Sequence, residues 1–174
     1  MANTYTLIAS STVGSGGAAS ISFTSIPSTY TDLCIKYSVR SSGNPAATYA
    51  YITFNGSSSA SYGMRRLYGF SSTVASSESS NASSIAGAFL VGGSDQTANT
   101  FGNGELYIPN YTSSNYKSVS GDSVDENNSA TNSFKFLAAG LWSNTSAITS
   151  ITLTGETTNF AQYSTAYLYG IKKS

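Results

Sequence analysis

Carboxylates are the side chains of this sequence with the widest scope for chemistry, because it has eight acidic residues and no histidine. The lack of histidine excludes Ser-His-Asp and Cys-His catalysis and most catalytic zinc sites. Two carboxyl groups about 5 to 9.5 Å apart could still hydrolyse a glycosidic bond. Most of these acids stand alone in segments that we expect to be solvated loops, so we predict no catalytic residue and no enzymatic activity. The acids are Asp32, Glu78, Asp95, Glu105, Asp122, Asp125, Glu126 and Glu156.

The one acidic cluster is Asp122-Ser-Val-Asp-Glu-Asn-Asn128. Calcium takes about six to eight oxygen ligands, and carboxylates, amides and carbonyls of such a loop can supply several. The cluster lacks the spacing of an EF-hand loop, so a polar turn between strands is the favoured interpretation. We therefore predict no metal site and no cofactor, with calcium at this loop as the open alternative.

Cys34 is the single cysteine, which excludes an internal disulfide. Residue alternation places it on the polar side of a strand, and no histidine is present to activate its thiol. We predict a small strand residue without reactivity.

Tyrosines and one arginine are the candidates for a binding surface. Tyr167 and Tyr169 share a strand face with Ile171 and are predicted to lie in the core. Five other tyrosines lie nearer predicted loops, where they could contact a sugar or a protein, although ordinary packing is the alternative. Arg65 and Arg66 must point to opposite faces of a strand, and one could cross a subunit interface or pair with an acid. The predicted binding residues are Tyr49, Tyr51, Tyr62, Arg65, Tyr111 and Tyr116.

The charge pattern excludes several kinds of partner. Eight basic residues balance the eight acids, and no basic run exceeds the pairs Arg65-Arg66 and Lys172-Lys173, so the footprint of nucleic-acid binding is missing.

No apolar stretch approaches the roughly 18 residues of a membrane helix, and Met1–Tyr5 lacks the features of a signal peptide. Charged residues make up 9% of the chain, and a net charge near zero favours self-association. We expect a homo-oligomer, with a trimer favoured.

The elements that must position these side chains are strands. β-branched and aromatic residues recur in short runs separated by Ser, Gly and Asn, while helix formers are scarce. Asn55-Gly56 predicts a hairpin turn, with Met64–Phe70 pairing back onto Thr48–Phe54, and the Ser-rich stretch Ser71–Ser84 predicts a long surface loop. We predict one domain, residues 1–174, folded as an antiparallel, jelly-roll-like β-sandwich of about eight to ten strands. The candidate segments for these strands are Tyr5–Ala9, Ala19–Phe23, Thr31–Arg40, Thr48–Phe54, Met64–Phe70, Ile85–Val91, Gly104–Pro109, Tyr116–Ser120, Phe134–Trp142, Ala147–Leu153 and Thr165–Ile171.

Several segments also carry a family resemblance. The opening from Thr6 to Leu33 resembles that of small virion proteins of tailed phages of aquatic bacteria, cyanophages among them. The resemblance spans nearly the whole chain and implies a structural protein of a phage particle, with no catalytic motif to transfer. The other matching segments are Ile52-Thr-Phe-Asn-Gly56, Tyr107-Ile-Pro-Asn-Tyr111, Ser123–Asn128, Ala139–Leu153 and Tyr167-Leu-Tyr-Gly-Ile171.

The resemblance leaves two placements on the exterior of the virion. A capsid decoration (cement) protein would bind the major capsid protein and stabilise the head. A tail-fibre tip would bind tail components and present loops to a glycan on the host surface. The chain shows no repetitive shaft segment, so decoration is favoured. In either case the protein would be made in the host cytoplasm and would act without nucleic acid or membrane as partner.

Overall fold

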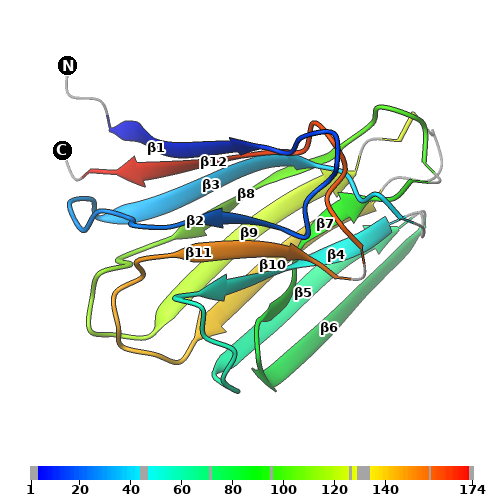
Figure 1. Ribbon diagram of the computed structural model, residues 1–174. Helices are drawn as coiled ribbons and strands as arrows, with labels where there is room; N and C mark the ends of the chain where they lie inside the picture. The colour runs from blue at the N-terminus through cyan, green and yellow to red at the C-terminus, as the bar shows by residue number, and fades with distance from the viewer. Residues whose placement is uncertain are drawn as a thin grey trace.

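A computed structural model describes residues 4–43, 47–70, 72–94, 96–125, 127–128, 134–156 and 158–172. These residues form twelve strands and no helix (Figure 1). This confirms the all-β prediction. The strands are β1 (Tyr5–Thr12), β2 (Ser20–Phe23), β3 (Asp32–Val39), β4 (Ala47–Phe54), β5 (Tyr62–Phe70), β6 (Thr73–Ala82), β7 (Ile85–Gly92), β8 (Gly102–Ile108), β9 (Lys117–Asp125), β10 (Phe134–Trp142), β11 (Ile151–Gly155) and β12 (Thr165–Ile171).

Eight of these strands form a jelly roll. They pair antiparallel in nested fashion, β1 with β12, β2 with β11, β3 with β8 and β4 with β7. The nesting produces two packed sheets, one containing β1-β12-β3-β8 and the other consisting of β2-β11-β4-β7. This double sheet closed by long connections is the jelly-roll arrangement, so the predicted sandwich is confirmed.

The remaining four strands extend one sheet beyond this jelly roll. β9 and β10 pair with each other, β5 and β6 pair with each other, and β10 joins β5. The result is an eight-stranded sheet in the order β1-β12-β3-β8-β9-β10-β5-β6. In Figure 1 this sheet runs from β1 behind β2, β11 and β4 to β6 at the lower edge. We call β5, β6, β9 and β10 the extension.

The core lies between the two sheets and follows the two-residue alternation of the strands. In β3, Leu33, Ile35 and Val39 are fully buried and face β2, β11 and β4. At one end, the ring of Phe54 lies 5.5 Å from that of Trp142, which stacks on Tyr62 at 6.0 Å. These rings join the four-stranded sheet to the extension.

The Ser-rich stretch that predicted a loop is a strand. Within Ser71–Ser84, residues Thr73–Ala82 form β6 at the edge of the eight-stranded sheet, and position 71 lies outside the described residues. The loop prediction was wrong because sheet pairing depends on a partner as well as on composition. Here β5 supplies the backbone hydrogen-bond partners of β6 and also the larger side chains.

The predicted pairing of β5 with β4 is also wrong. The Asn55-Gly56 turn forms, with positive φ at both residues, but β5 then crosses to the other sheet and pairs with β10 and β6. The side chain of Asn55 accepts hydrogen bonds from the backbone N–H groups of Thr149 (2.8 Å) and Ser150 (3.1 Å). The turn is thus held by the segment before β11 rather than by a hairpin partner.

The predicted direction of Tyr167 and Tyr169 needs correction. Ala166 and Leu168 of β12 are buried in the core, so Tyr167 and Tyr169 point outward. Cys34 lies on that same outer face but is fully buried. Its direct neighbours in the adjacent strands are Tyr169 and Tyr107, and these large side chains explain the burial, which alternation within one strand could not reveal.

Candidate functional site

The outer side of the extension is a broad surface of aliphatic and small polar side chains, which we call the hairpin face. Leu67 of β5 and Leu137 of β10 lie directly opposite each other and are 48% and 58% exposed. Val74 is 73% exposed and Leu141 is 41% exposed. Exposed apolar residues gathered in this way are typical of surfaces that bind other proteins. The hairpin face comprises Gly63, Arg65, Leu67, Val74, Ser76, Glu78, Ser118, Ser120, Asp122, Lys135, Leu137, Ala139 and Leu141.

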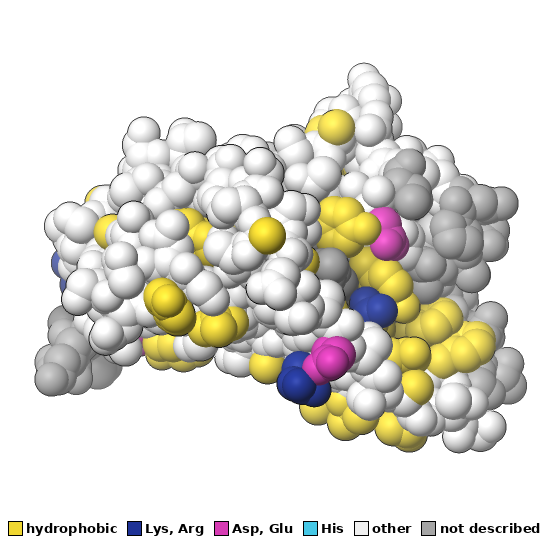
Figure 2. Space-filling view, turned by 90° about the horizontal axis from the view of Figure 1, so that it is seen from below, with side chains coloured by type: hydrophobic (Ala, Val, Ile, Leu, Met, Phe, Trp, Pro, Cys, Tyr) yellow, Lys and Arg dark blue, Asp and Glu magenta, His cyan; other side chains and the backbone are white. Residues whose placement is uncertain are grey.

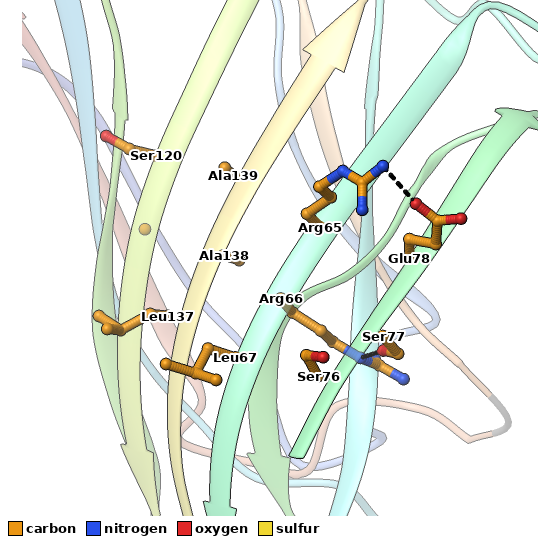
Figure 3. A pocket seen from close by; sticks show the side chains of 11 residues that line it. Arg65, Arg66, Leu67, Ser76, Ser77, Glu78, Ser120, Leu137, Ala138 and Ala139 are labelled. Carbon is orange, nitrogen blue, oxygen red and sulfur yellow. Dashed lines mark hydrogen bonds and ion pairs between the residues drawn. The ribbon is translucent and has the colours of Figure 1, made fainter. Parts of the chain in front are cut away.

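A shallow depression of about 700 Å³ lies in the hairpin face. Its floor is low because Ser120 and Ala139 are small, and Leu67 and Leu137 rise beside them (Figure 3). Arg65 and Glu78 form an ion pair of 2.6 Å at its border. Both side chains are well exposed, so the pair adds a polar rim more than stability.

The inner side of the extension carries a cluster of aromatic rings around Arg66. The Arg66 guanidinium carbon lies 4.2 Å from the ring centre of Tyr49, 5.5 Å from Phe136 and 5.7 Å from Tyr68. Such distances allow cation–π attraction. Arg66 Nε also donates a hydrogen bond to Ser77 Oγ. We call Tyr49, Arg66, Tyr68 and Phe136 the Arg66 cluster.

A carboxylate lies beside the Arg66 cluster. Glu156 accepts hydrogen bonds from the hydroxyls of Tyr51 (2.8 Å) and Thr48 (3.4 Å). Burial, together with the bond to Glu156, raises the pKa of Tyr51 to about 12. From the underside of the molecule, hydrophobic side chains gather around a basic side chain, with an acidic one close by (Figure 2). Rings, guanidinium and carboxylate are the groups that bind sugars or polar peptide groups.

The structure brings together only part of the predicted binding set. Tyr49 and Tyr51 lie at the Arg66 cluster, whereas Arg65 lies on the hairpin face. Tyr116 is 59% exposed in the loop before β9 and belongs to neither set. Tyr62 and Tyr111 are buried, so neither presents a ring to solvent.

The two buried tyrosines use their hydroxyls to hold neighbouring segments in place. Tyr62 accepts a hydrogen bond from Phe54 N (3.0 Å) and donates to carbonyls of the same turn. Tyr111 donates to the carbonyl of Pro27. Arg66 was considered with Arg65 but was not among the predicted binding residues, although its alternation with Met64 and Tyr68 along β5 could have placed it on the apolar side.

Most of the described carboxylates have structural contacts. Asp32 accepts hydrogen bonds from Tyr107 Oη (2.7 Å) and Asn110 N (2.8 Å), and Glu105 pairs with Lys36 at 2.6 Å. The bond to Asp32 is the main cause that raises the pKa of Tyr107 to about 12. These acids connect strands and loops of the jelly roll.

The acidic cluster that suggested calcium is not a turn at its start. Asp122 and Asp125 both belong to β9, where Asp122 is exposed on the hairpin face and Asp125 is buried on the other side. Gln96 donates a hydrogen bond to Asp125, and Glu126 lies outside the described residues. Among the residues that the structure describes, no three His, Cys, Asp or Glu side chains are placed to hold a metal ion.

Comparison with known proteins returns no match to this chain, either among protein-family models or among curated proteins. In the described part of the chain, no helix is long and apolar enough to span a membrane.

Proposed function

We propose that this protein is a non-enzymatic structural component on the exterior of a phage virion, and that it acts as a capsid decoration protein. The resemblance of its sequence segments to small phage virion proteins supports the virion. Jelly rolls are common in viral capsid proteins and lectins, which is support by analogy of fold only. The hairpin face supports a role in docking onto another protein.

The observation that carries the docking role is the exposed row of aliphatic side chains on the hairpin face. Leu67 and Leu137 are adjacent, and burying a leucine side chain fully contributes about 1.5–3 kcal/mol. Small neighbours such as Ser120 and Ala139 allow a partner surface to approach the strands closely. The partner we propose is the major capsid protein, whose repeated outer surface would present one complementary site per copy.

The Arg66 cluster favours a second candidate function, recognition of a host glycan at a tail-fibre tip. Aromatic rings provide apolar platforms, while Arg66 and Glu156 provide a donor and an acceptor for hydroxyl groups. In that role the inner side of the extension would bind the glycan, and the hairpin face would contribute less to binding.

A crossed experiment separates the two candidates. Leu137→Asp places a charge in the apolar row, and Arg66→Ala removes the guanidinium from the cluster. Each variant is tested for co-sedimentation with phage heads that lack this protein and for adsorption to host cells. Ser10→Asp, at an exposed position of distant β1, is the matched control.

For decoration, we expect Leu137→Asp to weaken head binding roughly 30-fold or more, since about 2 kcal/mol of apolar contact is replaced by a desolvated charge. Arg66→Ala and Ser10→Asp should bind heads like the unmodified protein. Loss of cell adsorption by Arg66→Ala, with no head binding by any form, would instead establish the glycan-binding candidate. Full head binding by Leu137→Asp would disprove docking through the hairpin face.

A further inference from the structure

β6 is the free edge of the eight-stranded sheet. One side of the strand pairs with β5, and no strand among the described residues pairs with its other side. Backbone N–H and C=O groups on an open edge are a template for another strand. Proteins that remain monomeric usually protect such edges with lysine, proline, bulges or a short strand.

The regular part of β6 lacks these protections. Thr73–Ser79 pairs with β5 without interruption, and the ladder shifts only beyond it, near Asn81, which has a positive φ of 53°. Thr73–Ala82 contains no proline and no lysine, and Glu78 is its only charged residue.

Two other sheet edges, β1 and β2, differ from β6. β1, at the opposite edge of the same sheet, has a register shift between Leu7 and Ala9, in the middle of the strand. β2, at one edge of the four-stranded sheet, is only four residues long. β6 therefore offers a longer regular run for a new strand than β1 or β2.

We propose that β6 pairs antiparallel with β6 of a second copy of this chain, about a twofold axis perpendicular to the sheet. Such an axis keeps the two hairpin faces on the same side, because opposed residues in an antiparallel pair point to the same face. Centring the axis on Ser76 uses all of Thr73–Ser79. Each Val74 then lies opposite Glu78 of the second copy, and each Ala75 lies opposite Ser77.

The charges along β6 support this register, and they support a second copy of the chain as the partner strand. With the axis at Ser76, no two like charges are opposed, and Glu78 keeps its ion pair with Arg65. With the axis at Glu78, the Cβ atoms of the two Glu78 residues would lie about 5 Å apart, and two like charges would be directly opposed. A net charge of zero removes the long-range repulsion between copies. The dimer would join two hairpin faces into one continuous sheet surface, and in this sense the inference extends the proposed docking function.

Two substitutions at one exposed position test the pairing. Val74→Glu places a carboxylate opposite Glu78 of the second copy, whereas Val74→Lys places a cation there. Each dimer contains this contact twice. We expect the unmodified chain and Val74→Lys to dimerise, and Val74→Glu to have a dissociation constant roughly tenfold higher than that of Val74→Lys. Sedimentation equilibrium over a concentration series measures the constants, and thermal unfolding confirms that both variants fold.

Three results would overturn the pairing of β6 with a second copy. A monomer at all concentrations shows that the edge stays open, and a trimer shows a different contact. Equal weakening by both substitutions assigns the contact to the apolar hairpin face instead of the β6 edge. Head binding is measured separately, so a dimer that does not bind heads contradicts only the decoration role, and a head-binding monomer contradicts only the dimer.

Discussion

Buried polar side chains connect separate segments of this protein by hydrogen bonds, and Lys117 is the clearest example. Its side chain is fully buried. Nζ donates hydrogen bonds to the carbonyls of Ser113 (2.8 Å), Asn115 and Asn144 (3.4 Å). Burial lowers the pKa of the ammonium group. A lysine in a polar segment usually lies at the surface, so sequence alone could not show that this one connects two loops.

Cys34 leads to a prediction at the scale of one residue. Burial, reinforced by the charge of Glu105, raises the pKa of its thiol to about 12. The thiolate is the reactive form, so native protein near pH 8 should react with Ellman's reagent at least about 100-fold more slowly than unfolded protein. Stopped-flow absorbance with and without urea measures both rates. Rapid labelling of the native protein would show that the tyrosines beside Cys34 do not exclude the reagent.

At the scale of elements, one glycine allows β7 to pack closely on the extension. A Cβ atom added to Gly140 of β10 would lie 2.7 Å from Cδ1 and 2.8 Å from Cγ2 of Ile85. Ile85 is buried and β-branched, so it has little freedom to move aside.

Gly140→Ala should therefore destabilise the fold by about 1–3 kcal/mol through overpacking. Gly63→Ala is the matched control, because the nearest atom to a Cβ atom there is Ser79 O at an ordinary 3.6 Å. Urea unfolding of both variants measures the difference. Equal stability of the two variants would show that Ile85 repacks freely.

Sequence patterns predicted the elements better than their partners. In β3, the buried residues Leu33, Ile35 and Val39 follow the two-residue alternation that the sequence itself displays, because one sheet face is buried. The β6 strand could not be predicted from Ser71–Ser84, since its stability comes from pairing with β5. The same limit applies to the site: Tyr49 was identified, but its contact with Arg66 joins strands from different sheets.

At the scale of the whole molecule, the raised pKa values of one thiol and two phenols predict how stability depends on pH. The pKa values of Cys34, Tyr51 and Tyr107 rise to about 12 in the folded chain, from 9.0 for the thiol and 10.0 for the phenols. At a pH above the ordinary pKa values of 9.0 and 10.0, the unfolded chain releases protons that the folded chain retains. The stability these groups contribute is therefore complete below about pH 9 and is lost as the pH rises toward about 12.

We expect the free energy of unfolding to fall by on the order of 3 kcal/mol between about pH 8 and pH 11. Urea titrations at a series of pH values measure it, and tyrosinate absorbance reports the phenols directly. Cys34→Ala provides a variant without the thiol contribution, whose decline should be smaller. A free energy that stays constant over this interval would contradict the raised pKa values.

The nested pairing of the jelly roll also affects the order in which the chain can fold during synthesis. β12 lies between β1 and β3 and pairs with both. Tyr5 pairs with Ile171, so β1 and one edge of β3 stay unpaired until β12 has left the ribosome. In a cell that makes many copies at once, these unpaired strand edges are the points at which nascent chains would aggregate with one another. The strand pairs β5–β6 and β9–β10 of the extension can form earlier, since the two strands of each pair are neighbours in sequence.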